Sequence, residues 1–118
     1  MIRTRLALVA AVAITALGLT AVAQAASSLT GTVGPGFTIT LTQGGKKVSK
    51  LKAGTYTIKI ADKSNIHNFH LTGPGVNKKT SVGGTGSTTW TVKLKSGTYK
   101  FVCDPHAASG MKGSFKVT

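Results

Sequence analysis

Apolar and polar residues alternate in several short stretches of this chain, which is the pattern of β-strands that bury one face. Phe37, Ile39 and Leu41 alternate with threonines and are expected to form one such half-buried strand. No stretch of useful length carries an apolar stripe at helical spacing. The other alternating sets are Tyr56, Ile58 and Ile60; Phe69 and Leu71; Trp90, Val92 and Leu94; Tyr99, Phe101 and Cys103; and Phe115 and Val117.

Glycine-containing turns separate these stretches. Residues 51–56 (LKAGTY) resemble residues 94–99 (LKSGTY), and in each copy a turn with glycine begins an alternating strand. Equivalent turns of this kind are expected in a sandwich of two sheets. Residues 72–88 are rich in Gly, Thr, Ser, Pro and Lys and are expected to be a long surface connection. The pattern therefore predicts an all-β fold, a Greek-key β-sandwich of about seven to eight short strands.

The first 25 residues have the composition of a secretory signal peptide. Arg3 belongs to a short positive start, residues 6–22 are almost wholly apolar or small, and a small-x-small cleavage pattern ends at Ala25. The alternative is an uncleaved membrane anchor, because the apolar run is near the lower length limit for spanning a bilayer. The cleavage pattern favours removal of these 25 residues over their retention as an anchor. We therefore expect an exported monomer, in the periplasm, cell envelope or extracellular space, with residues 26–118 as its single domain and no membrane span.

The chain is strongly basic, with a formal net charge of +13 and only two acids, Asp62 and Asp104. Such a charge implies acidic partners or surroundings. Nucleic acid is a poor candidate, because the predicted domain contains lysine but no arginine, the usual reader of bases. We expect redox partner proteins with an acidic docking surface. Anionic envelope polymers, anionic lipid head groups and simple solubility are the alternatives.

Cys103 is the only cysteine, so the chain cannot form an internal disulfide. A metal that binds the thiolate would protect it outside the cell, whereas a buried, inert cysteine is the alternative. Cys103, His106 and Met111 follow one another with C-x2-H-x4-M spacing. Pro105 stops the strand that ends at Cys103, and Gly110 lets the chain turn back. A tight loop can thus present a thiolate, an imidazole and a thioether to one point.

Two further imidazoles lie upstream, in the segment Ile66-His67-Asn68-Phe69-His70. A thiolate and two imidazoles with a distant methionine sulfur form the blue-copper arrangement. Strand alternation puts His67 on the face of Phe69 and His70 on the opposite face. If Phe69 belongs to the core, His67 looks toward the ligand loop. His70 is the less favoured ligand and is expected to be a surface or hydrogen-bonded histidine.

From about residue 37 to 118, and most clearly at His67-Asn68 and from Cys103 to Met111, the sequence resembles the cupredoxins, the family of plastocyanin, pseudoazurin and amicyanin. The resemblance implies one copper ion that cycles between Cu(I) and Cu(II). It implies that His67, Cys103 and His106 are the ligands and that Met111 is a weak fourth, although a methionine there could instead only fill the core.

The same resemblance assigns roles to residues around the copper. Asn68 is expected to tie the two ligand loops together by hydrogen bonds, and His106 to be the exposed electron port. Loops such as 34–36 and 73–75 are expected to join the alanines at 107–108 in an apolar patch around that port.

One residue of the ligand loop departs from the family pattern. Asp104 follows the cysteine, where Ser or Thr is common in cupredoxins. A carboxylate near copper should favour Cu(II) and lower the reduction potential, unless Lys112 neutralises it.

The complete ligand set favours a soluble one-electron carrier. The alternative is an extracytoplasmic protein for copper storage, delivery or homeostasis. An enzyme is not expected. Copper oxidases and nitrite reductases need a further copper site built from extra histidines, and only His70 remains after the assignment. Two acids in the whole chain also leave no catalytic triad or paired-carboxylate set.

Overall fold

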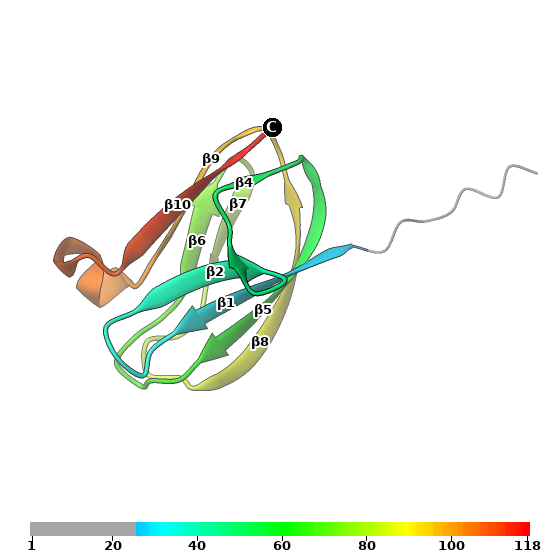
Figure 1. The fold of residues 1–118 in the computed structure, drawn as a ribbon. Coiled ribbons are helices and arrows are strands. Elements are labelled where there is room, and N and C mark those ends of the chain that lie inside the picture. The colour runs from blue at the N-terminus through cyan, green and yellow to red at the C-terminus, as the bar shows by residue number, and fades with distance from the viewer. Residues whose placement is uncertain (1–25) are drawn as a thin grey trace, which may run out of the picture.

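The computed structural model describes residues 26–118; the predicted signal peptide, residues 1–25, lies outside the described residues. The described chain is a β-sandwich of two five-stranded sheets, which confirms the predicted fold class (Figure 1). Its elements are β1 (Ser27–Val33), β2 (Ile39–Gln43), β3 (Lys46–Lys47), β4 (Lys50–Leu51), β5 (Gly54–Asp62), β6 (His70–Gly73), β7 (Val76–Lys79), β8 (Gly86–Leu94), β9 (Gly97–Val102), the 3-10 helix η1 (Asp104–Ser109) and β10 (Lys112–Val117). Two of these strands, β3 and β4, are only two residues long.

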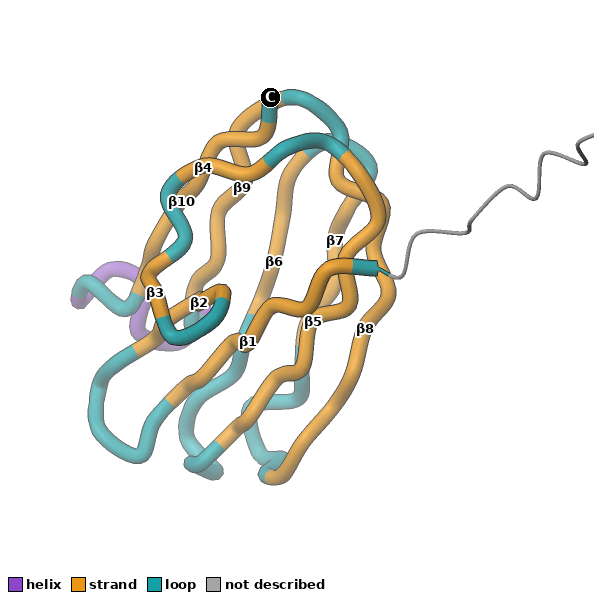
Figure 2. Tube along the Cα trace, turned by 45° about the vertical axis from the view of Figure 1, so that its right-hand side comes forward, coloured by secondary structure: helices purple, strands orange, loops and turns teal. Residues whose placement is uncertain are grey.

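The chain passes repeatedly from one sheet to the other. The first sheet has the strand order β3-β2-β1-β5-β8 and the second the order β4-β10-β9-β6-β7. Both sheets are mixed, because β1 pairs with β5 in parallel and β4 pairs with β10 in parallel. Figure 2 shows the two layers and the loops that cross between them at the ends of the sandwich. Within residues 26–118, no helix is long and apolar enough to cross a membrane.

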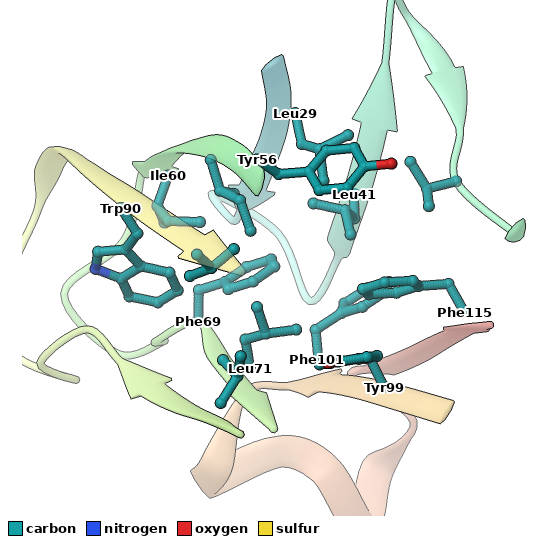
Figure 3. Close-up of a cluster of buried hydrophobic side chains, with 14 of the residues drawn as sticks. Leu29, Leu41, Tyr56, Ile60, Phe69, Leu71, Trp90, Tyr99, Phe101 and Phe115 are labelled. Atoms are coloured by element: carbon teal, nitrogen blue, oxygen red, sulfur yellow. The ribbon is translucent and has the colours of Figure 1, made fainter. Parts of the chain in front are cut away.

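The predicted alternation produces the core between the sheets (Figure 3). Phe69 stacks on Phe101 with ring centroids 5.6 Å apart, and Tyr99 stacks on Phe115 at 5.3 Å. Burial of such rings supplies much of the hydrophobic stabilisation of a small domain. Cys103 belongs to the same buried cluster, so one end of the core continues into the ligand loop.

The repeated turn has the role that its sequence indicates. Gly54 begins β5 and Gly97 begins β9, with φ angles of 156° and 145° that disfavour other residues. The two strands lie in opposite sheets. Each then turns its tyrosine, Tyr56 or Tyr99, into the core between the sheets.

Four expectations about the strands were incomplete or wrong. The described residues form ten strands where about seven to eight were expected, in part because β3 and β4 are only two residues long. Phe37 lies outside β2 and is 65% exposed, so it is not a core residue. Residues 72–88 are not one surface connection, because β7 pairs with β6 as a hairpin inside that range. The first strand, β1, was missed because Gly31 interrupts its alternation. A Cβ at Gly31 would lie 2.7 Å from Ile60 Cδ1, so close packing of the core requires the glycine.

Candidate metal centre

Two side chains of the ligand loop, Cys103 and His106, meet a third from a distant segment, His67, at one end of the sandwich. His67 Nδ1 lies 3.0 Å from His106 Nδ1, and Cys103 Sγ lies 3.6 Å from His67 Nδ1 and 3.4 Å from His106 Nδ1. A point equidistant from these three atoms is about 1.9 Å from each, close to the lengths of metal–imidazole and metal–thiolate bonds. One ion can therefore contact all three ligand atoms.

The ligand loop is closed by its own backbone. Cys103 N–H donates to the carbonyl of Met111 (3.0 Å), His106 N–H donates to the carbonyl of Cys103 (3.0 Å), and Met111 N–H donates to that of His106 (3.2 Å). Pro105 lies in the first turn of η1, where its missing N–H costs nothing. Gly110 ends η1 in the left-handed conformation, at φ 99°. The loop is thus built in the way that the spacing of its residues predicts.

The donor set fits copper. Cys103 is a free thiol and is fully buried, as is His67, while His106 is partly exposed. Thiolate and imidazole together suit copper in both oxidation states. Met111 is also buried, at 2% exposure, and its backbone forms hydrogen bonds with the backbones of Cys103 and His106. Ligation by its sulfur stays a prediction.

An aromatic side chain covers the two histidines. The ring of Phe37 lies 5.1 Å from that of His67 and 4.9 Å from that of His106, edge-on to both. Its loop joins β1 to β2 at the same end of the sandwich as η1 (Figure 1). This role was not predicted from the sequence, because Phe37 shares the alternation of the strand that follows it. The signal was the preceding Gly34-Pro35-Gly36 turn, in which Gly34 lies against His67.

The second glycine–proline turn lies elsewhere. Pro74 packs against Gly97, and its carbonyl accepts a hydrogen bond of 2.7 Å from the Tyr99 hydroxyl. These residues lie at the start of β9, whereas Cys103 follows the end of that strand. The expectation that residues 73–75 join residues 107–108 around His106 was therefore wrong.

Asn68 connects the two ligand-bearing segments. Its Oδ1 accepts a hydrogen bond from the backbone N–H of Asp104 (2.8 Å). Its Nδ2 donates to the Asp104 carboxylate (2.7 Å) and to the carbonyl of Thr80 (3.2 Å). The side chain is 1% exposed. These contacts match the loop-tying role expected of Asn68, whose burial the simple alternation did not predict.

His70 lies apart from the three converging side chains and forms an ion pair with Asp104. Its Nδ1 lies 2.8 Å from Asp104 Oδ1, and its Nε2 lies 2.7 Å from Asn77 Oδ1. Partial burial opposes protonation, but the hydrogen bonds to Asp104 and Asn77 raise the pKa of His70. Burial likewise opposes ionisation of Asp104, yet hydrogen bonds from His70 and Asn68 lower the pKa of that carboxyl. The cation that pairs with Asp104 is thus His70 and not Lys112.

Known proteins share this architecture. The profile of the copper-binding plastocyanin/azurin family matches residues 46–118. A plastocyanin of Daucus carota is 49% identical over 35 residues, which are 30% of this chain and 36% of that plastocyanin. The match therefore spans about a third of the curated relative's length.

Two solved structures illustrate the similarity of fold. Rusticyanin from Thiobacillus ferrooxidans is 26% identical with a TM-score of 0.55, and the alignment covers 77% of this chain and 76% of rusticyanin. Reduced auracyanin from Roseiflexus castenholzii is 23% identical with a TM-score of 0.56, over 80% of this chain and 99% of auracyanin. With more than half of its length matched by the family profile, the chain belongs to the plastocyanin/azurin family of copper-binding proteins, the cupredoxins.

Proposed function

We propose that this protein is an exported type 1 copper protein that carries one electron at a time. His67, Cys103 and His106 are its strong ligands, and Met111 is the weak fourth. The observation that carries the proposal is the convergence of one thiolate and two imidazole nitrogens within 3.6 Å of one another. When bound there, a single copper ion would supply the Cu(I)/Cu(II) couple.

The protein's part is to hold the donor atoms still. Cys103 and His67 are fully buried, and the ligand loop is braced by three backbone hydrogen bonds and by Asn68. Packed side chains and satisfied polar groups resist movement. A site held in this way changes little between the two oxidation states, so electron transfer needs little reorganisation.

The surroundings of His106 support its role as the electron port. Its side chain is partly exposed, and an exposed aromatic ring lies against it. Phe37 touches the ring and is 65% exposed, while Ala108 of η1 is also exposed. An apolar surface lets a partner approach closely without the cost of desolvating charges.

The lysines supply the docking charge in this proposal. All thirteen are exposed, and the outer face of the second sheet carries several on neighbouring strands. Lys116 of β10 lies directly beside Lys50 of β4, and Lys100 of β9 lies beside Ser114 of β10. Like charges side by side are unfavourable unless an anionic surface meets them. We therefore assign acidic redox proteins as partners.

Rapid electron exchange separates a carrier from a copper-delivery protein. We expect the copper protein to exchange electrons quickly between its Cu(I) and Cu(II) forms and to keep Cu(I) when a chelator of moderate affinity is added. Fast loss of Cu(I) with slow exchange would instead favour copper storage or delivery. A bimolecular rate with an acidic redox protein should fall as salt rises, because salt screens the lysines. A rate independent of salt would leave solubility as the better account of the charge.

A further inference from the structure

Lysines gather at the end of the sandwich that lies opposite the candidate metal centre. β1 runs from Ser27 at this end to Val33, and the next residue, Gly34, lies against His67. A strand of seven residues spans about 20 Å, so the two ends are well separated (Figure 1). We call the far end the basic pole and define it by five exposed lysines: Lys46, Lys47, Lys50, Lys52 and Lys116.

The fold itself turns these lysines outward. Residues 46–52 (KKVSKLK) hold four of them, while Val48 and Leu51 of the same segment are buried in the core. The segment includes β3 of the first sheet and β4 of the second, so its lysines extend over the edges of both sheets. Lys116 of β10 joins them, because it is paired with Lys50. Neighbouring like charges repel, and an anionic surface that faces them relieves this repulsion.

Both acids of the chain lie at the other end of the sandwich. Asp62 is the last residue of β5 and is paired with Val33, and Asp104 directly follows Cys103 in the ligand loop. Because the chain has only these two acids, its positive charge is least compensated at the basic pole. An anionic surface should therefore attract this pole most strongly and leave the end that carries His106 facing away.

The basic pole is also hollowed. A cleft of about 630 Å³ is lined by Lys50 and Lys52 together with hydroxyl and amide side chains, namely Ser27, Gln43 and Thr55. All five of these side chains can donate hydrogen bonds, and the volume is that of a site for a small ligand. Such a cleft suits a phosphate group and the alcohol attached to it, which together form the head group of an anionic lipid.

The place where the N-terminal segment joins the sandwich favours a membrane over other anionic surfaces. The described chain begins at the basic pole, where Ala26 lines the cleft. Only residues 23–25 separate Ala26 from the apolar run of the predicted signal peptide. Before cleavage, that run would hold the basic pole at the membrane, so a lipid surface is the first anionic surface that the pole meets.

We propose that the basic pole binds the head groups of an anionic lipid bilayer. The protein then stays at the membrane surface, and the end that carries His106 faces away from the lipid. The lysines of the second sheet that lie nearer the metal centre, Lys100 and Lys112, stay free to meet a redox partner. This inference goes beyond the proposed function and does not depend on copper.

Sedimentation with lipid vesicles tests the proposal. The exported form, residues 26–118, is used, so that the apolar N-terminal run does not itself bind the lipid. It should bind vesicles that contain phosphatidylglycerol and leave vesicles of phosphatidylcholine alone unbound. Each lysine near an anionic membrane strengthens binding by about fivefold. Replacement of four lysines by glutamine in one variant should therefore weaken binding at low salt by more than about a hundredfold: Lys46, Lys47, Lys50 and Lys52.

The matched control replaces four exposed lysines outside the basic pole by glutamine: Lys59, Lys63, Lys78 and Lys79. It removes the same amount of charge and should weaken vesicle binding far less. Equal losses in the two variants would overturn the proposal, because net charge alone would then account for the binding. A wild-type protein that binds soluble polyphosphate but no vesicles would overturn it as well, since the partner would then be an anionic polymer.

A second readout uses the wild-type apo-protein alone and maps its orientation on the membrane. A paramagnetic label on the lipid head group should broaden the NMR signals of the backbone amides of residues 50–54 and spare those of residues 106–110. The opposite pattern would overturn the proposal even if the lysine variants fail to fold. In that case the lipid would contact the exposed apolar side chains near the metal centre, such as Phe37 and Ile66.

Discussion

Replacement of Asn68 by alanine tests how much the link between the two ligand segments stabilises the fold. The change removes hydrogen bonds of 2.7, 2.8 and 3.2 Å and leaves the N–H of Asp104 without its partner. Neutral hydrogen bonds contribute about 0.5–1.5 kcal/mol each and one to a charged group about 1.5–3 kcal/mol. We therefore expect Asn68→Ala to lower the free energy of unfolding of the apo-protein by about 3–5 kcal/mol, a large part of the stability of a small domain.

Urea unfolding of the apo-protein measures this loss. With a slope of about 2 kcal/mol per molar for a small domain, the midpoint should fall by about 2 M. Asn77→Ala is the control, because that exposed amide makes one hydrogen bond, to His70. It should cost about 1 kcal/mol or less. The reasoning is refuted if Asn68→Ala costs no more than Asn77→Ala.

Three further predictions concern packing, the cover over the histidines and pH. Gly113→Ala should lower the free energy of unfolding, measured with urea, by about 1–3 kcal/mol, because the added Cβ would overlap the Phe101 ring. An unchanged free energy of unfolding would contradict this packing. Phe37→Ala should speed removal of copper by a water-soluble chelator while shifting the unfolding midpoint little, since the ring is mostly exposed; an unchanged rate would argue against a covering role. The ion pair of His70 and Asp104 should stabilise the fold by about 1 kcal/mol or less. This contribution should be full between about pH 4 and 6.5, the unfolded pKa values of the two groups. It should be lost above that window as pH rises through the raised pKa of His70, and below it as pH falls through the lowered pKa of Asp104. Unfolding of wild type and Asp104→Asn from pH 3 to 9 measures it, and a constant difference would contradict the assignment.

Alternation along the chain was enough to predict most of the core. Tyr99 and Phe101 face inward as expected, and Cys103 continues their row into the ligand loop. Local spacing also placed His106 correctly, because proline and glycine leave a nine-residue loop few ways to turn. These features depend on residues that are close together in the sequence, so a single sequence is enough to predict them.

Contacts between distant segments were harder to predict. Phe37 shares the alternation of its neighbours, but the chain leaves the sheet before Ile39, so the ring lies over the histidines instead of in the core. The pairing of Asp104 with His70 depends on β6 and β9 being neighbours, which periodicity does not reveal. The sequence offered Lys112 as a cation that could neutralise Asp104, whereas the structure pairs the carboxylate with His70.

Titration of Cu(II) into the purified apo-protein, followed by visible spectroscopy, tests the central claim most directly. One equivalent should produce an intense thiolate-to-copper band. Cys103→Ser should abolish this band, and His67→Ala should disrupt it far more than His70→Ala. A colourless wild-type complex, or a band that depends on His70 more than on His67, would contradict the proposed copper site.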